Sequence, residues 1–359
     1  MKHISMIGTQ FLGVPAQKGG AIELLSFDLA KLLAENNYDV SYFSVQSEIN
    51  LKEKNIEIIR FPAKKTSGIL FNFFVFFKML GKKTGAIYLS GCSMLPVALA
   101  LSRLKRIPLI FHEFNHNPWI EKNNFAYDFL AKQSIKHADK VIVPTEFIRK
   151  KIIEFDSSTK NKIIVLPNFL DLKQFPKKMP EKSKQIAFVG RIVKHKNPEL
   201  LIDAFSAVAK DFPEWKLKIF GTIDDQILFK NISKKFNEKI SFSSGIERKQ
   251  LIQELSNSSV FVLPSTQEAF GLAFLEAMAC WTPCIGARID SVKEVIKENE
   301  TGFLINALDE KDLSAKLTSM LSQKQLRETM GKNARKKAET LSIDFLSPKY
   351  LNFFKEVIK

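Results

Sequence analysis

Short apolar runs alternate with longer stretches of helical periodicity through the first half of the chain. The short runs have the length and the β-branched or aromatic content of strands, whereas the longer stretches repeat apolar residues every three or four positions. Predicted strands lie at 3–8, 39–45, 56–61, 85–91, 108–114, 140–145 and 162–168, and predicted helices at 21–37, 69–80, 95–106 and 126–138. Strands spaced by helices indicate βαβ units, and therefore a parallel sheet with helices on both faces.

A second series of the same kind follows residues 176–184, a stretch rich in lysine and proline that is typical of a linker. Predicted strands lie at 186–190, 216–221, 240–244, 260–265, 282–287 and 301–305, and predicted helices at 198–212, 249–258, 271–279 and 312–323. The fold class is therefore α/β, with two Rossmann-like doubly wound domains, 1–175 and 176–341. Ligands of open α/β sheets bind beyond the carboxyl ends of the strands, so two such sheets facing each other predict a substrate cleft between the domains.

Length and composition agree with this organisation. A chain of 359 residues that is 45% hydrophobic is long enough for two cores. The three cysteines, Cys92, Cys280 and Cys284, lie in apolar surroundings without CxxC spacing, so we expect reduced core thiols in a cytosolic protein. The N-terminus resembles a first strand and loop rather than a signal peptide, and no apolar run reaches the ~20 residues that span a bilayer.

The positive charge is concentrated in one region of the first half. The formal net charge is +16, and residues 60–106 hold nine basic residues and no acidic one. This region encloses the aromatic run 69–80, and cations around aromatic rings suit an anionic membrane surface. The run is also apolar all round a helical wheel, which favours a buried core helix, and both interpretations stay open. Nucleic-acid binding is disfavoured, because no RNP-like, zinc-finger or helix-turn-helix pattern is present.

Two carboxylates frame a glycine in the second half. Glu268 and Glu276 lie on either side of Phe270-Gly271-Leu272, where a predicted helix begins after a strand. A helix N-terminus binds phosphate, glycine lets a ligand approach the backbone, and carboxylates accept hydrogen bonds from hydroxyl groups. A nucleotide sugar, with a diphosphate between two sugars, would use all of these groups. Arg191 and Lys196, beyond the first strand of this half, would offset the diphosphate charge as it leaves.

These elements resemble the retaining GT-B glycosyltransferases of family 4. The resemblance covers nearly the whole chain, in the family's order, with the most specific motif at 263–279. The matching segments are Gly19-Gly20 with Glu23, 138–147, 165–175, 189–197, 263–279 and 291–305. The family's GT-B fold implies two Rossmann-like domains facing across a cleft, with the last helix, here 342–359, packing back on the first domain. That segment itself is typical of a broken and then amphipathic helix.

The resemblance implies a role for each matching residue of the second domain. Glu276 matches the acid that holds the nucleotide ribose, and Glu268 matches the acid near the transferred sugar. Arg191 and Lys196 match the basic pair on the donor diphosphate. Phe270-Gly271-Leu272 matches the helix N-terminus that faces phosphate or sugar.

The first domain contributes fewer matching residues. Gly19-Gly20 matches the glycine loop that approaches the diphosphate. His112 matches a histidine beside the reacting sugar, although His116 is near and a histidine at a strand end also satisfies backbone groups. Glu113 is a further candidate, as the base that activates the acceptor.

The sequence departs from the family pattern at two places. Trp281 stands where the family usually has glycine at the end of a helix, and a bulky residue there disfavours a positive φ. Asp290 and Ser291 stand where the family usually has two glycines, so we expect a narrower donor pocket with a negative charge near phosphate.

The predicted activity is transfer of a hexose-type sugar from a nucleotide-diphosphate sugar to an acceptor hydroxyl, with retention at the anomeric carbon. No cofactor or metal is expected, because Asp224 and Asp225 are adjacent and form no DxD motif. The expected acceptor is a glycan or lipid-linked intermediate of bacterial surface glycan synthesis, at the inner face of the cytoplasmic membrane. The alternatives are a nucleotide-sugar epimerase with the same fold and a non-enzymatic, membrane-associated binding protein.

Overall fold

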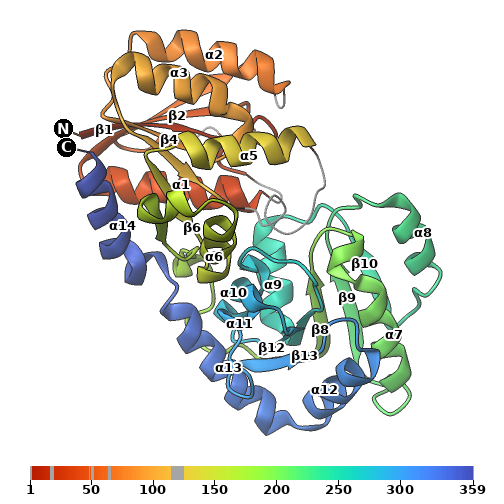
Figure 1. Cartoon of the computed structure of the whole chain (residues 1–359). Coiled ribbons are helices and arrows are strands. Elements are labelled where there is room, and N and C mark those ends of the chain that lie inside the picture. The colour runs from red at the N-terminus through yellow and green to blue at the C-terminus, as the bar shows by residue number, and fades with distance from the viewer. Residues whose placement is uncertain are drawn as a thin grey trace. The chain divides into compact units, whose positions relative to one another are not determined.

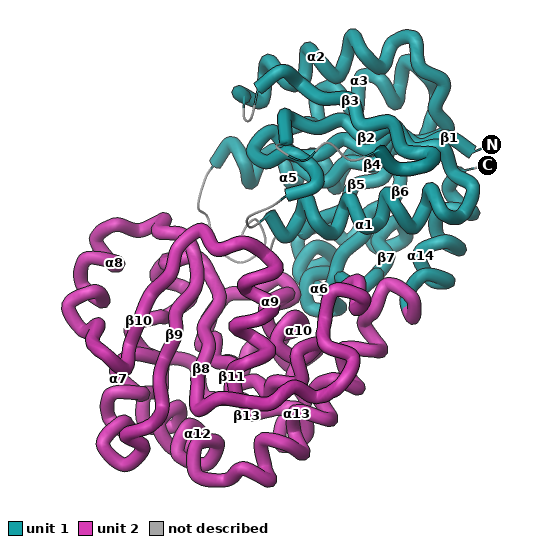
Figure 2. The backbone as a smooth tube through the Cα atoms, turned by 180° about the vertical axis from the view of Figure 1, so that it is seen from behind, with its two compact units in different colours: residues 1–169, 346–359 teal, residues 170–345 magenta. Residues whose placement is uncertain are grey.

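A computed structural model describes residues 2–16, 20–47, 49, 52–63, 66–114 and 125–358. The chain forms two compact units, shown in different colours in Figure 2. Unit 1 holds Met1–Phe169 and Leu346–Lys359, and unit 2 holds Leu170–Phe345. The chain therefore passes between units near the predicted domain boundaries at 175 and 341.

Unit 1 is built on a sheet of seven parallel strands in the order β3-β2-β1-β4-β5-β6-β7. The strands are β1 Lys2–Ile7, β2 Tyr38–Val45, β3 Ile56–Phe61, β4 Ala86–Leu89, β5 Leu109–His112, β6 Lys140–Val143 and β7 Ile163–Val165. The strand order reverses at β1, which pairs with β2 on one side and β4 on the other. All carboxyl ends lie at one edge because every pair is parallel.

Helices cover both faces of this sheet (Figure 1). The helices of unit 1 are α1 Ala21–Glu35, α2 Gly68–Leu80, α3 Leu95–Lys105, α5 Phe125–His137, α6 Glu146–Phe155 and most of α14 Ile343–Val357. Neighbouring strand residues point to opposite faces. Phe43 accordingly lies in the core with α2, α3, α5 and α6, whereas the Tyr42 ring meets Phe27 of α1 edge to face.

The C-terminal helix α14 packs within unit 1. The Tyr350 hydroxyl donates to the Pro167 carbonyl at 3.2 Å, and the Tyr350 ring lies 5.1 Å from the Phe169 ring. The Phe354 ring lies 6.3 Å from the Tyr88 ring of β4. The predicted break in this helix is wrong, since α14 continues through Pro348.

Unit 2 repeats the architecture with six parallel strands in the order β10-β9-β8-β11-β12-β13. The strands are β8 Ser183–Val189, β9 Lys216–Phe220, β10 Ile240–Ser243, β11 Ser258–Leu263, β12 Cys284–Ala287 and β13 Gly302–Ile305. The helices are α7 Pro198–Val208, α8 Gln226–Ser233, α9 Arg248–Asn257, α10 Leu272–Ala279, α11 Asp290–Lys293, α12 Glu310–Ser322 and α13 Lys324–Glu339. The strand order reverses at β8, between β9 and β11.

The predicted alternation is confirmed, with four helices added. The sequence analysis had not assigned α6, α8, α11 or α13, because α8 and α11 are short and α6 and α13 are rich in charged residues. All three cysteines are free and buried, as predicted. In the part of the chain that the structure describes, every helix is too short or too polar to cross a bilayer.

Candidate active site

The carboxyl ends of β8 and β11 bring most of the predicted residues of unit 2 to one place. These two strands are neighbours at the point where the strand order reverses, which is where open α/β sheets bind ligands. The loop after β8 carries Arg191 and Lys196, and the loop after β11 carries Glu268 and leads into α10.

Backbone hydrogen bonds hold the two loops together. The His195 carbonyl accepts from the Thr266 amide at 2.9 Å and from the Ser265 hydroxyl at 3.2 Å. The Asn197 side-chain amide donates to the Pro264 carbonyl at 2.8 Å. The residues on either side of Lys196 are thus fixed against the segment that precedes Glu268.

Lys196 and Glu268 form an ion pair across these loops. The Lys196 Nζ donates to the Glu268 Oε1. Their side chains are only 14% and 10% exposed, so water screens the pair weakly. The sequence analysis assigned Lys196 to the diphosphate and Glu268 to the transferred sugar, and the structure places the two groups side by side.

Gly271 begins α10 in a conformation that only glycine adopts easily. Its φ is +85°, and a Cβ there would lie 2.6 Å from the Phe274 Cδ2 atom. Gly271 has no side chain to cap the first turn of α10, which begins at Leu272. Among the described residues, backbone N–H groups at the positive end of the helix dipole therefore remain for a ligand. Phe270, just before the glycine, is buried and anchors the turn.

Glu276, on the second turn of α10, is paired with a residue that the sequence analysis missed. The Arg248 Nη1 donates to the Glu276 Oε1 at 2.6 Å, with side chains 19% and 9% exposed. The Arg248 Nε donates to the Gln174 side chain at 3.2 Å, and its guanidinium lies 5.8 Å from the Phe175 ring centre. A lone arginine at the start of α9 matches no motif. The only available clue was that a buried carboxylate needs a cation.

Arg191 does not join the Lys196–Glu268 pair. Its Nη1 lies 3.2 Å from the Asp224 Oδ2, and its side chain is 57% exposed. Asp225 accepts a hydrogen bond from the Leu228 amide at 2.9 Å and caps α8. Both adjacent acids therefore have protein partners in this structure.

Trp281 occupies the left-handed position that the family pattern implied, with φ 62°. The amides of Trp281 and Thr282 donate to the carbonyls of Met278 and Ala277, the Schellman pattern in which glycine is usual. The indole N–H donates to the Pro176 carbonyl at 3.2 Å, and the Arg335 guanidinium lies 5.7 Å from the ring centre. These contacts compensate for the strained backbone and hold the indole between the linker and α13.

The second departure from the family pattern lies at the start of α11. The Asp290 carboxylate is 66% exposed and lies 3.0 Å from the Lys293 Nζ, which offsets its charge. Ser291 is buried, and its hydroxyl has no hydrogen-bond partner among the described residues. The side chain of Asp290 thus extends toward solvent and its own helix.

Unit 1 presents two of its predicted residues at the carboxyl edge of its sheet. Gly20 begins α1 with φ 77°, and a Cβ there would lie 3.0 Å from the Glu23 Oε2. Glu23 accepts a hydrogen bond from Thr9, and burial raises its pKa. Gly19 and His116 lie outside the described residues.

His112 ends β5 as a buried, neutral side chain. Burial lowers the pKa of His112 to about 3. The Tyr88 hydroxyl lies 2.7 Å from the His112 Nδ1 and has no other hydrogen-bond partner among the described residues. The Tyr88 hydroxyl can donate to a bare Nδ1, which places the ring proton on Nε2, or accept from a protonated Nδ1. The Nε2 atom has no partner within the described part of the chain. Glu113, the alternative base, is also buried.

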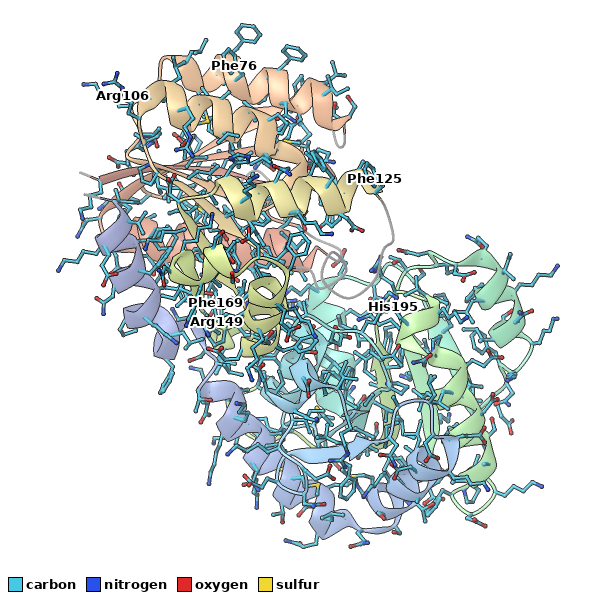
Figure 3. All side chains as sticks on the ribbon, in the orientation of Figure 1. Phe76, Arg106, Phe125, Arg149, Phe169 and His195 are labelled. Atoms are coloured by element: carbon cyan, nitrogen blue, oxygen red, sulfur yellow. The ribbon has the colours of Figure 1, made fainter. Side chains whose placement is uncertain are left out.

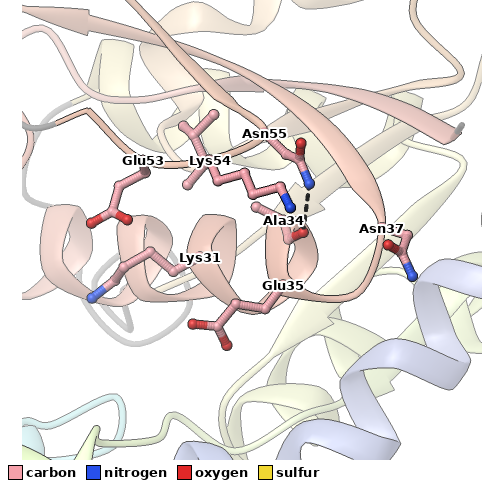
Figure 4. A pocket seen from close by; sticks show the side chains of 8 residues that line it. Lys31, Ala34, Glu35, Asn37, Glu53, Lys54 and Asn55 are labelled. Carbon is pink, nitrogen blue, oxygen red and sulfur yellow. Dashed lines mark hydrogen bonds between the residues drawn. The ribbon is translucent and has the colours of Figure 1, made fainter.

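A surface hollow elsewhere on unit 1 does not belong to this chemistry (Figure 4). It is lined by the end of α1 and the residues before β3, where the Asn55 side chain donates to the Ala34 carbonyl at 3.2 Å. These residues lie at the amino ends of β2 and β3, the edge opposite to the candidate ligand site. Within the described ranges, no cluster of three or more His, Cys, Asp or Glu side chains suits a metal ion.

The sequence patterns of two protein families match the chain in tandem. The pattern described as Glycosyltransferase Family 4 matches residues 22–174, and the pattern described as Glycosyl transferases group 1 matches residues 171–337. Together they span both units, and the second one includes every candidate residue of unit 2.

Individual proteins agree with these matches. The chain is 28% identical to the sulfoquinovosyl transferase SQD2 of Arabidopsis thaliana over 264 residues, which are 67% of this chain and 50% of that protein. It is 27% identical to the capsular polysaccharide biosynthesis glycosyltransferase CapM of Staphylococcus aureus over 246 residues, 60% of each chain. The chain thus matches less than two thirds of the length of either relative.

A solved structure shares the fold across both units. Anabaena Alr3699/HepE, solved in complex with UDP and glucose, matches with a TM-score of 0.79 at 18% identity, over 99% of this chain and 100% of that chain. This confirms the predicted GT-B type of α/β fold.

Proposed function

The chain belongs to the glycosyltransferases of family 4 (glycosyl transferases group 1), and on that premise we propose a retaining, metal-independent transfer of a hexose-type sugar from a nucleotide-diphosphate sugar to an acceptor hydroxyl. The observation that carries the proposal is the buried Lys196–Glu268 pair beside the uncapped N-terminus of α10. A cation, an acid and free backbone donors at one strand edge are the groups that a diphosphate joined to a sugar requires.

Each charged group of unit 2 has a part in this proposal. Lys196 and the α10 N-terminus stabilise the negative charge that grows on the departing diphosphate. Glu268, released from Lys196 by the donor, accepts hydrogen bonds from the sugar hydroxyls. Glu276 accepts from the ribose hydroxyls, and Arg191 exchanges Asp224 for a phosphate oxygen. These cations supply the charge stabilisation for which other enzymes use a metal ion.

His112 of unit 1 supplies a hydrogen bond to the reacting sugar. In the tautomer whose Nδ1 accepts from Tyr88, the Nε2–H is a donor on a ring that stays neutral near pH 7. A neutral donor orients a sugar hydroxyl without adding charge next to a positively charged transition state.

The acceptor in this proposal is a glycan or lipid-linked intermediate, reached from the cytoplasmic side of the membrane. Support comes from the basic, aromatic region 60–106 and from the similarity to CapM, whose name refers to capsular polysaccharide biosynthesis. The sugar, the base and the linkage are open to experiment.

A transfer assay tests the proposal. Purified protein is incubated with UDP-, GDP-, ADP- or dTDP-sugars and a lipid extract, and products are detected by mass spectrometry. We expect one donor to give a glycosylated product, and NMR of that product to show the anomeric configuration of the donor. Donor turnover to an isomeric nucleotide sugar without acceptor would instead indicate an epimerase. Donor binding without any turnover would indicate a binding protein.

A further inference from the structure

Helix α2 has two apolar faces, and only one of them is buried. Phe71, Val75 and Met79 are fully buried, at the four-residue spacing of one helical face. Ile69, Phe73 and Phe77 follow the same spacing but are 70%, 60% and 67% exposed. At about 100° per residue, the two series point to nearly opposite sides of the helix.

The exposed face continues past its central stripe into a larger apolar surface. Leu70 and Leu80 of α2 are 57% and 42% exposed, and Leu104 of α3 is 64% exposed. The end of α3 lies against the end of α2, since the Lys105 Nζ donates to the Leu80 and Lys82 carbonyls, each at 3.0 Å. A contiguous apolar surface of this kind marks an interaction site in a folded protein.

Cations flank one end of this surface, near the end of α2. Lys78, Lys83, Arg103 and Arg106 are all exposed and lie on α2, α3 or the residues just after them. Figure 3 shows Phe76 and Arg106 on the same outer side of unit 1, and α2 lies on that side in Figures 1 and 2. Lys82 and Arg103 have acidic partners, Glu57 and Asp139, whereas residues 60–106 contain no acid.

We propose that the exposed face of α2 docks on an anionic lipid bilayer, with Ile69, Phe73 and Phe77 in the interface and the cations at the end of α2 on lipid phosphates. Aromatic rings favour the headgroup boundary, and each nearby lysine or arginine strengthens binding to anionic lipid. A protein partner would need matching acids, whereas a bilayer provides an apolar layer beneath a negative one, in the same order as this surface. The inference deepens the proposed function and rests on it for its biological meaning, because a lipid-linked acceptor is found at a bilayer.

Vesicle flotation tests the inference without donor or acceptor, so its outcome is independent of the transfer assay. The protein is mixed with vesicles of phosphatidylcholine, with or without phosphatidylglycerol. We expect binding that requires phosphatidylglycerol and weakens with salt. Phe73→Ser/Phe77→Ser should weaken it by at least about tenfold, since each ring loses its apolar burial.

Two matched variants control for apolar surface and for charge. Ile227→Ser/Phe345→Ser removes two apolar side chains of unit 2 that are 77% and 63% exposed, and should bind as wild type does. Lys78→Gln/Lys83→Gln/Arg106→Gln should lose binding on the order of tenfold to a hundredfold, whereas Lys230→Gln/Lys311→Gln/Lys324→Gln on unit 2 should not.

Three results would overturn the inference. The first is absence of vesicle binding by the wild type. The second is that the variants of unit 1 bind vesicles as tightly as their control variants of unit 2 do. The third is a wild-type dimer in sedimentation that Phe73→Ser/Phe77→Ser makes monomeric, because the surface would then be an interface between copies.

Discussion

The two units bring different chemistry to the same type of sheet edge. In unit 2 the candidate residues are charged and already paired: Lys196 with Glu268, Arg248 with Glu276, and Arg191 with Asp224. In unit 1 the candidate side chain, His112, is neutral and hydrogen-bonded to a tyrosine. The positive surface of unit 1 lies instead on α2 and α3. On the proposed function, unit 2 would therefore stabilise the phosphate charge, whereas unit 1 would orient an uncharged group.

Removing the buried cation of unit 2 should have the largest effect. We expect Lys196→Met to lower kcat for sugar transfer by about 10² to 10³, because the departing diphosphate loses a fixed positive charge. Initial rates at saturating donor measure this. Lys235→Met is the matched control, since Lys235 pairs with Asp203 of the same unit at 2.6 Å, away from the candidate residues and with both side chains half-buried. A wild-type kcat in Lys196→Met would contradict the assignment of unit 2.

Adding a methyl group at the start of α10 should have the next largest effect, on the free energy of unfolding. We expect Gly271→Ala to lower the free energy of unfolding by about 2 to 3 kcal/mol, because the new Cβ meets Phe274 in a left-handed backbone. Gly245→Ala is the control: φ there is +64°, but no atom lies within 4 Å of the new Cβ, so we expect about 1 kcal/mol. Urea unfolding compares the two. Equal losses would mean that strain alone, and no close packing, requires glycine at 271.

The neutral His112 of unit 1 should change how the free energy of unfolding depends on pH. Burial lowers the pKa of His112 to about 3 from an ordinary value near 6.5. Between these values the unfolded chain binds a proton that the folded chain does not, so this group makes the free energy of unfolding fall as pH falls. The free energy of unfolding changes by up to about 1.4 kcal/mol per pH unit through this group.

Urea unfolding at several pH values isolates this contribution. We expect His112→Gln to have a shallower loss of stability than wild type between about pH 6 and pH 4. Identical slopes in wild type and His112→Gln would show that His112 is charged or exposed in the folded protein.

The smallest effect should come from Trp281, which the structure places between the linker and α13. We expect Trp281→Phe to cost about 1 kcal/mol, the value of the indole hydrogen bond to Pro176. Donor affinity, measured by calorimetry, should not change. A tenfold weaker donor affinity would show that Trp281 shapes the pocket after all.

Sequence alone could predict the parts that depend on local pattern. The periodicity of apolar residues predicts the two series of strands and helices. Glu268 and Gly271 belong to a short motif within a single loop and the start of a single helix, so their roles could be predicted as well. Arg248 could not be predicted, because its meaning depends on Glu276, which is distant in sequence and meets it only in the folded sheet. The pairing of Arg191 with Asp224 was hidden for the same reason.

Helix α2 shows a second limit of sequence analysis. Apolar residues on both faces gave no periodic contrast, so buried core and exposed surface looked equivalent in the sequence. The structure separates them, with Phe71 buried and Phe73 exposed two residues later. Only packing against α3 and the sheet decides which face is covered.

Thermal unfolding of the purified protein with a panel of UDP-, GDP-, ADP- and dTDP-sugars tests the central claim most directly, namely that unit 2 binds a nucleotide-diphosphate sugar. A ligand that binds only the folded state at a hundred times its Kd stabilises it by about 2.7 kcal/mol. The account predicts that one nucleotide raises the Tm of wild type, that Glu276→Gln loses the shift, and that Glu254→Gln, which disrupts the pair with Lys218 in the same unit, keeps it. A shift that survives in Glu276→Gln, or no shift with any nucleotide, would contradict it.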